Sequence, residues 1–175
     1  MLQQLLEIVQ ESTKDSVVKN QKVPNQFNTG VQQEIAESIT DFMKNQVASG
    51  NINGVVELLK KGSNTKSTKS DPIVGGIVKT LVSNLSKKFN ISEDVAIAIA
   101  QQAIPLVISG LTKKAANKRD NSIDFSTILG ELTKGSNKSG GLDIGSLAQT
   151  LIQVNSKKGG GDLFGSILGG FLKGK

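Results

Sequence analysis

The sequence of 175 residues contains no cysteine, no histidine, no tryptophan and no tyrosine. Without cysteine, the chain has no disulfide, no thiolate nucleophile and no cysteine-ligated zinc or iron–sulfur site. Without histidine, it lacks Ser-His-Asp and Cys-His catalysis and the commonest ligand of transition metals. Phenylalanine, with 6 residues, is the only aromatic type left to stack on sugars or bases. These absences predict a protein that is not an enzyme and that holds no metal or other cofactor.

Two features that would direct the chain into a membrane are also missing. The N-terminal MLQQLLEIVQE has neither the positive region nor the long apolar region of a signal peptide. No stretch reaches the ~18–20 apolar residues that a transmembrane helix requires. We therefore expect a cytoplasmic protein without a transmembrane span.

Residues 91–116 form the stretch around which we expect the rest of the chain to pack. This segment, ISEDVAIAIAQQAIPLVISGLTKKAA, is the longest run without a turn signal and is apolar nearly all the way round, as is typical of a buried helix. Ser92 can cap its start, and Pro105 should kink it near Gln101. The sequence therefore predicts an all-α protein: a bundle of about five to seven helices around a kinked central helix, with a Gly-rich C-terminal tail of short helices.

The composition divides the chain into four parts. Residues 1–61 are an N-terminal helical segment, and residues 62–71 are a polar linker. Residues 72–135 are a central helical core that packs with residues 1–61 as one domain. Residues 136–175 are the Gly-rich tail.

Local signals refine the helices before the central one. Asp15 and Ser16 interrupt the first helical pattern, and Asn53 can cap a short helix further on. Gly75 and Gly76 each cost roughly 1 kcal/mol relative to alanine inside a helix. Either close packing against a neighbour or a frayed first turn would explain these two glycines.

One set of residues has the spacing of a calcium-binding loop. Asp120, Ser122, Asp124 and Glu131 fall on its ligand positions, but Phe125 stands where the loop needs glycine. Asp124 is better explained as a helix cap.

A second set, Glu34, Glu37 and Asp41, could supply paired carboxylates for acid catalysis. All three lie on the polar face of an amphipathic helix, where charges are normally solvated. We therefore expect them to be surface residues.

The C-terminal part contains a weak internal repeat. IDFSTILGELTKG (123–135), LDIGSLAQTLIQ (142–153) and DLFGSILGGFLKG (162–174) each pair an aspartate cap with a short apolar helix, the third with one extra residue. Helices this short are marginal alone in water, so each copy needs a surface to dock on. The candidate interaction residues of the last copy are Leu163, Phe164, Ile167, Leu168, Phe171 and Leu172. Docking on the core, self-association, lying at a membrane surface and disorder are the alternatives for this copy.

The positive charge is concentrated in the same region, since residues 111–175 carry ten basic and five acidic side chains. The candidate basic patch comprises Lys113, Lys114, Lys118, Arg119, Lys157 and Lys158. Arg119 is the only arginine, and no aromatic residues interleave with the lysines, so a nucleic-acid recognition pattern is missing. Weak, lysine-mediated nucleic-acid binding stays open beside the simpler interpretation of solvated lysines.

Several segments occur in an order that resembles a known family: MLQQLLEIVQE, VPNQ, GNINGVVELL, AIPLVISGL, IDFSTILGEL and a final GGGDLFGSILGGFLK. This order is similar to the bacterial domain-of-unknown-function family 937, related to YidB-like proteins, over nearly the whole chain. The resemblance implies an all-helical fold, homeodomain-like in YidB-like members, with no established activity, cofactor or catalytic residue.

These features together predict a non-enzymatic helical protein that serves as a protein–protein interaction or structural module. Its partner is an unknown protein or a second copy of the chain, bound through the C-terminal tail. The alternatives are weak nucleic-acid binding and binding to a membrane surface through residues 162–175.

Overall fold

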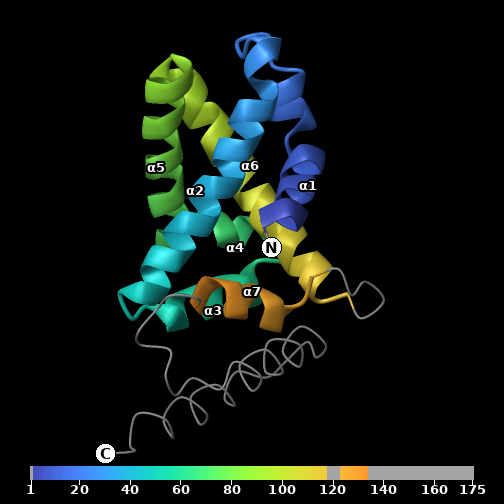
Figure 1. The fold of residues 1–175 in the computed structure, drawn as a ribbon, viewed down its shortest axis with the longest axis vertical. Helices are drawn as coiled ribbons and strands as arrows, with labels where there is room; N and C mark the ends of the chain where they lie inside the picture. Colours follow the sequence, from blue (N-terminus) through green and yellow to red (C-terminus); the bar gives the residue numbers. More distant parts are fainter. Residues whose placement is uncertain (1, 118–122, 134–175) are drawn as a thin grey trace, which may run out of the picture.

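The computed structural model describes residues 2–117 and 123–133 (Figure 1). Within these ranges the chain forms helices and no strand, which confirms the predicted all-α class. The predictions for the tail, residues 136–175, lie outside the described residues.

The described residues form seven α-helices, a π-helical turn η1 and a 3-10 turn η2. In chain order they are α1 (Leu2–Ser12), η1 (Lys14–Val18), η2 (Asn25–Phe27), α2 (Asn28–Ala48), α3 (Ile52–Lys61), α4 (Thr65–Lys69), α5 (Pro72–Phe89), α6 (Glu93–Ala115) and α7 (Phe125–Thr133). The turn η1 begins where Asp15 and Ser16 were expected to interrupt the first helix.

Four helices, α1, α2, α5 and α6, stand side by side as a bundle, and α3 and α7 cross its lower end (Figure 1). Helix α6 packs against α5, α1 and α4, and 13 of its 23 residues are buried. Pro105 lies inside this helix and is itself buried. The prediction of a central helix wrapped by the other segments is therefore confirmed.

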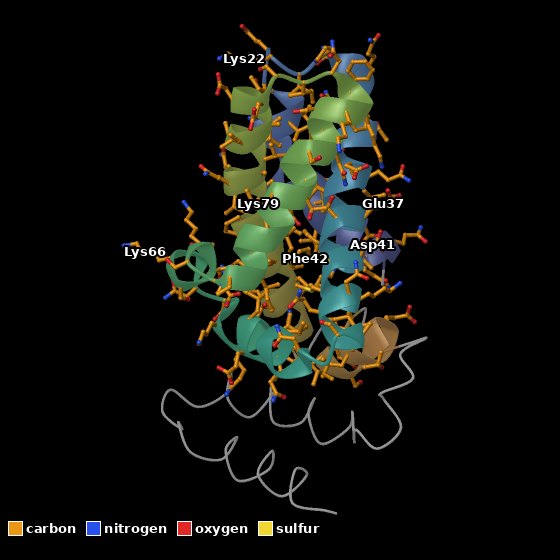
Figure 2. The ribbon with its side chains drawn as sticks, turned by 90° about the vertical axis from the view of Figure 1, so that its left-hand side faces the viewer. Lys22, Glu37, Asp41, Phe42, Lys66 and Lys79 are labelled. Carbon is orange, nitrogen blue, oxygen red and sulfur yellow. The ribbon has the colours of Figure 1, made fainter. Side chains whose placement is uncertain are left out.

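Two glycines bring neighbouring helices into close contact. A Cβ atom at Gly76 of α5 would overlap the ring of Phe42, which projects from α2 toward α5 (Figure 2). A Cβ atom at Gly110 of α6 would lie 2.8 Å from Cγ2 of Ile8 in α1. The lack of a side chain at these positions sets how closely α5 and α6 approach their neighbours.

Helix α6 corrects the expectation that no stretch is apolar enough to cross a membrane. By length and composition alone it would qualify, with a mean hydropathy of 1.7 over an 18-residue window. The expectation failed because Ile, Val, Leu and Ala are frequent enough in α6 to keep the average hydropathy high despite Gln101 and Gln102. Since 67% of that window is buried inside the protein, α6 is packed as a core helix is.

Two local predictions before α5 need correction. Asn51, not Asn53, caps α3, because its side-chain oxygen accepts the backbone N–H of Gly54 at 3.3 Å. The stretch predicted as a linker is polar, but it contains α4, which Asn64 caps by accepting the backbone N–H of Lys66 at 3.0 Å. This short helix packs against α6 and is part of the fold.

Candidate functional site

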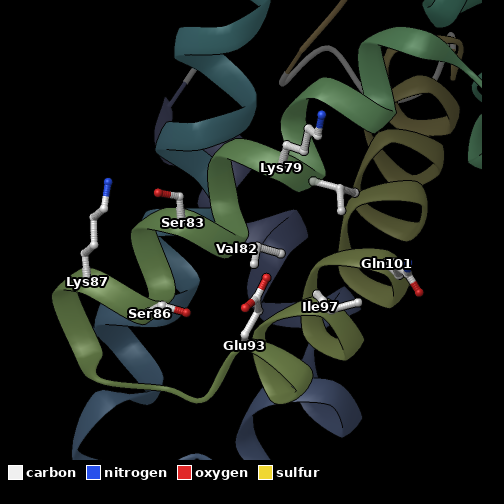
Figure 3. A pocket seen from close by; sticks show the side chains of 9 residues that line it. Lys79, Val82, Ser83, Ser86, Lys87, Glu93, Ile97 and Gln101 are labelled. Carbon is white, nitrogen blue, oxygen red and sulfur yellow. The ribbon is translucent and has the colours of Figure 1, made fainter.

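A hollow runs between the outer surfaces of α5 and α6 and continues between α6 and α4, where no residue of α5 lines it, and we call the whole hollow the α5–α6 groove. Three adjoining depressions form it, and they share Val78, Gln101 and Pro105 at their boundaries. Its lining residues are Val74, Gly75, Val78, Lys79, Val82, Ser83, Ser86 and Lys87 of α5, Glu93, Ile97, Ala98, Gln101, Gln102, Pro105 and Leu106 of α6, and Thr65 and Lys69 of α4. The part farthest from α4 has a volume of about 470 Å³ (Figure 3).

The floor of the groove is apolar because apolar side chains next to the core-facing sides of α5 and α6 are only partly buried. Every fourth residue of α5 from Ile73 to Leu85 points into the core and is buried. Val78 and Val82 follow that stripe by one position, so they lie half-buried at the edge of the groove, opposite Ile97 of α6. The floor therefore consists of side chains that the fold covers only in part.

Leu106 is the most exposed large apolar side chain of the groove. It lies near α4 and is 40% exposed, and Val18 of η1, at 43%, is the other large apolar side chain with such exposure in the described ranges. A single exposed leucine is ordinary. It lies in the depression beside α4, and Gln101 lies between it and the half-buried valines and Ile97.

Charged side chains surround this apolar floor. Lys69, Lys79 and Lys87 stand along it, and Glu93 stands at the end farthest from α4 (Figure 3). Within the described part of the chain, none of these four forms an ion pair. Three lysines against one glutamate give the rim a formal charge of +2.

Two details show that the groove has room and an unused polar group. A Cβ atom added at Gly75 would meet no atom within 4 Å. The hydroxyl oxygen of Ser86 is buried and has no hydrogen-bond partner among the described residues. A buried hydroxyl without a partner is unfavourable, so a ligand that reached Ser86 would gain a hydrogen bond there.

The expectation that Glu34 is a solvated surface residue is wrong. Its side chain is only 5% exposed and accepts hydrogen bonds from Nζ of Lys88 at 2.6 Å and Nδ2 of Asn84 at 2.7 Å. The carboxylate of Glu34 in turn raises the pKa of Lys88, through this hydrogen bond first and through its charge second. Because both partners belong to α5, the cluster joins α2 to α5.

The other two carboxylates of that set behave as predicted for a polar surface. Glu37 is half-buried and accepts a hydrogen bond from Nε2 of Gln33 at 3.0 Å, and Asp41 is exposed (Figure 2). No group of three or more Asp or Glu residues that could hold a metal ion occurs in the described ranges. Glu34 therefore serves the contact between α2 and α5, and the three carboxylates are not arranged as a pair for acid–base catalysis.

Asp124 is a helix cap, as predicted. Its carboxylate accepts the backbone N–H of Thr127 and the hydroxyl of Ser126, both at 2.7 Å. These hydrogen bonds hold the pKa of Asp124 below its ordinary value. Asp120 and Ser122, whose spacing resembles that of a calcium loop, lie outside the described residues.

The structure describes only part of the candidate basic patch and none of the candidate tail residues. Lys113 is exposed, and Nζ of Lys114 lies 3.7 Å from a carboxylate oxygen of Glu7. The remaining members, Lys118, Arg119, Lys157 and Lys158, lie outside the described residues, as do Leu163, Phe164, Ile167, Leu168, Phe171 and Leu172. Three other described lysines, Lys69, Lys79 and Lys87, line the α5–α6 groove.

The sequence analysis did not identify this groove. A signal was present in α6, where Ala98, Gln101 and Gln102 recur at helical spacing and interrupt the apolar surface. Such a stripe identifies the exposed side of a core helix. Which helix would lie beside it could not be known from that stripe.

Residues 71–174 match the model of a family described as a bacterial protein of unknown function, DUF937. The match begins at the residue before α5, so it includes both main helices of the groove but not α1 to α4. No curated protein and no solved structure matches the chain.

Proposed function

The chain belongs to this bacterial DUF937 family, whose description assigns no activity, and we propose that it acts without catalysis, as a protein–protein interaction module that binds an amphipathic helix in the α5–α6 groove. The proposal places the protein in the bacterial cytoplasm. The observation that carries it is the groove itself.

The shape and composition of the groove suit a helix. Recognition of a helix in a groove requires an apolar channel that takes side chains at successive turns, with polar residues along its edges. On α6 the groove extends from Glu93 to Leu106, which corresponds to about 20 Å, or roughly the length of a helix of three to four turns. Its edges are lysines, which favour a partner with acidic residues beside its apolar face.

Photo-cross-linking in living cells tests this function. A photoreactive amino acid is placed at Ala98, which lies exposed in the groove, and at Gln33 of α2 as the matched control, which is exposed outside it. We expect an adduct of defined mass from Ala98 only, and a weaker adduct when Leu106→Gln is introduced beside it. Equal adducts from Ala98 and Gln33, or none from Ala98, would contradict the proposal.

A second candidate function is binding of a polyanion such as nucleic acid. Helices α4 and α5 contain five lysines and no acidic residue, and Asp71 between them is the only acid from Thr65 to Phe89. One of the five, Lys88, is engaged with Glu34. The candidate predicts a gel shift with duplex or single-stranded nucleic acid that weakens steeply with salt. No shift at low salt, or one that persists with Lys69→Gln and Lys79→Gln, would exclude this function for the groove.

A further inference from the structure

The described part of the chain contains one helical unit twice. The first repeat, residues 2–62, forms α1 with η1, then α2 and α3, and the second repeat, residues 72–117 and 123–133, forms α5, α6 and α7 in the same order. Helix α1 packs against α6, and α2 packs against α5. Figure 1 shows α1 and α5 on opposite sides of the bundle with α2 and α6 between them, as expected for two copies related by a two-fold rotation.

The buried positions of the two repeats correspond. In the first helix of each repeat every fourth residue is buried: Leu5, Val9, Thr13 and Val17 in the first repeat, and Ile73, Ile77, Leu81 and Leu85, each 68 positions later, in the second. In α2 and α6 the corresponding residues are 64 positions apart, and both members of each of these pairs are buried: Val31 and Val95, Gln32 and Ala96, Ile35 and Ile99, Ala36 and Ala100, Ile39 and Ala103, Thr40 and Ile104, Met43 and Val107, and Val47 and Leu111. The match at successive turns of both helices indicates an internal duplication.

The third helices of the two repeats begin in the same way. Asn51 caps α3 by accepting the backbone N–H of Gly54 at 3.3 Å, and Asp124 caps α7 by accepting the backbone N–H of Thr127 at 2.7 Å. Both caps accept the N–H of the residue three positions on. The buried residues that follow the caps also correspond: Ile52 and Phe125, Val55 and Ile128, Val56 and Leu129, and Leu59 and Leu132. The two repeats therefore share one fold to the end of the described residues.

Their outer surfaces differ where the second repeat forms the groove. Three apolar residues of the groove correspond to polar residues of the first repeat: Val78 to Gln10, Val82 to Lys14, and Ile97 to Gln33. Three residues of the groove that are not acidic correspond to acids: Lys79 to Glu11, Ser83 to Asp15, and Gln101 to Glu37. Two positions differ in the opposite direction, since Ser86 corresponds to Val18 and Glu93 to Thr29. An apolar floor flanked by lysine is thus particular to the second repeat.

The first repeat shows that the fold does not need apolar residues at these positions. Its polar side chains there bind one another: Nζ of Lys19 lies 2.8 Å from the Asp15 carboxylate, and Nε2 of Gln33 donates to Glu37 at 3.0 Å. Lys79 of the groove, in contrast, has no ion pair within the described ranges. Half-buried apolar side chains gain free energy when a partner removes them from water. The second repeat therefore has what a binding surface requires, and the first does not.

We propose that the second repeat alone binds the partner helix, through Val78, Val82 and Ile97 and through the charge of Lys79, while the first repeat completes the core. This inference rests on the proposed function and names the residues that give the groove its specificity. The occupant is one amphipathic helix of another protein per chain. Its apolar residues cover the valines and Ile97, and its acidic residues lie beside Lys79, because the groove has lost the acids of its counterpart and gained a lysine.

Photo-cross-linking at a matched pair of positions tests the inference in the full-length chain. A photoreactive amino acid is placed at Ser83 in the groove and, as the control, at its counterpart Asp15 in the first repeat. In cells we expect the adduct from Ser83 to be stronger than that from Asp15 by roughly fivefold or more. Mass spectrometry of the adduct should place the cross-link in a partner segment whose apolar residues recur three and four positions apart, with Asp or Glu beside them.

Exchanging residues between the repeats tests which side chains bind. Val78→Gln with Ile97→Gln gives the groove the residues of the first repeat and should weaken the Ser83 adduct roughly fivefold. The reverse exchange, Gln10→Val with Gln33→Ile, should leave that adduct unchanged. Thermal unfolding followed by circular dichroism checks that both variants are folded, as the polar residues of the first repeat lead us to expect.

A charge exchange supplies a second test at exposed positions. Lys79→Glu, which introduces the charge of Glu11, should weaken the Ser83 adduct roughly threefold, because an acidic partner is then repelled. Glu11→Lys should leave it unchanged. Both side chains are exposed, so neither substitution disturbs the core.

Equal adducts from Ser83 and Asp15 would overturn the inference, and so would a Ser83 adduct that persists in the Val78→Gln, Ile97→Gln variant. An adduct with the mass of two copies of the chain, or a cross-link in a basic segment, would overturn the identity of the occupant. None of these results affects the proposed function if Ala98 still gives an adduct and Gln33 does not, so the two proposals fail separately.

Discussion

Gly75 and Gly76 are adjacent in α5, but alanine should have opposite effects at the two positions. A Cβ atom at Gly75 meets no atom within 4 Å, since this residue faces the open groove. Alanine is more favourable than glycine inside a helix by about 0.5–1 kcal/mol. Gly75→Ala should therefore raise the free energy of unfolding by about that amount.

Gly76→Ala receives the same gain but must displace the ring of Phe42. The added Cβ atom would lie 2.8 Å from Cε2 and 2.9 Å from Cε1 of that ring, and closer still to Cζ. Forcing a methyl group into a packed contact costs about 1–3 kcal/mol. We therefore expect Gly76→Ala to be less stable than Gly75→Ala by about 1–3 kcal/mol, measured by urea unfolding followed at the helical circular dichroism signal.

A double-mutant cycle identifies the cause. In a Phe42→Leu background the ring is gone, so Gly76→Ala should become stabilising by about the same 0.5–1 kcal/mol as Gly75→Ala. If Gly76→Ala stabilises the unmodified protein as much as Gly75→Ala does, α5 does not lie against Phe42. The position of α5 relative to α2, and with it the shape of the groove on the other side of α5, would then be wrong.

Three other predictions follow from the described contacts. Glu34→Ala should lower the free energy of unfolding by about 1–3 kcal/mol in the same urea assay, because it leaves Asn84 and Lys88 without their buried acceptor. The control Glu37→Ala should change that free energy by less than about 0.5 kcal/mol. Asp124 has a lowered pKa in the folded protein, so its stabilising effect is complete above the ordinary value of 3.8 and is lost as the pH falls through the lower folded value. The variant Asp124→Asn caps the helix without titrating. Its melting temperature should therefore fall less than that of the unmodified protein across that acid range. Asn90 has a φ of +52°, so Asn90→Ala should lower the melting temperature while Asn90→Gly leaves it nearly unchanged.

Features that depend on neighbouring residues in the sequence were predictable. Asp71 followed by Pro72 predicts a helix start, and in the structure the Asp71 carboxylate accepts the backbone N–H of Ile73 at 2.9 Å. The central helix was predictable for the same reason, since a long apolar run after an acidic first turn needs no distant partner to be recognised. The cap of α3 was missed only because Asn51 and Asn53 are equally good caps.

Features that depend on contacts between distant segments were not predictable. Glu34 has the same local pattern as Glu37, yet it is buried because residues 50 and 54 positions later in the sequence close over it. Gly75 and Gly76 likewise look identical in the sequence, and close packing explains only the second. In both cases the arrangement of α2 against α5 decides the outcome.

The same contact accounts for the groove. Gly76 faces Phe42 of α2, and because Val78 and Val82 lie on the opposite side of α5 from Gly76, they face away from that contact and toward α6. On α6, the residues on the other sides are buried in the core, so Ile97 is left half-buried beside the valines and Leu106 is left exposed beside α4. An apolar surface of this kind loses free energy to water unless something covers it. Helix α7 shows the other outcome in the same fold, because the rest of the protein covers all of its large apolar side chains.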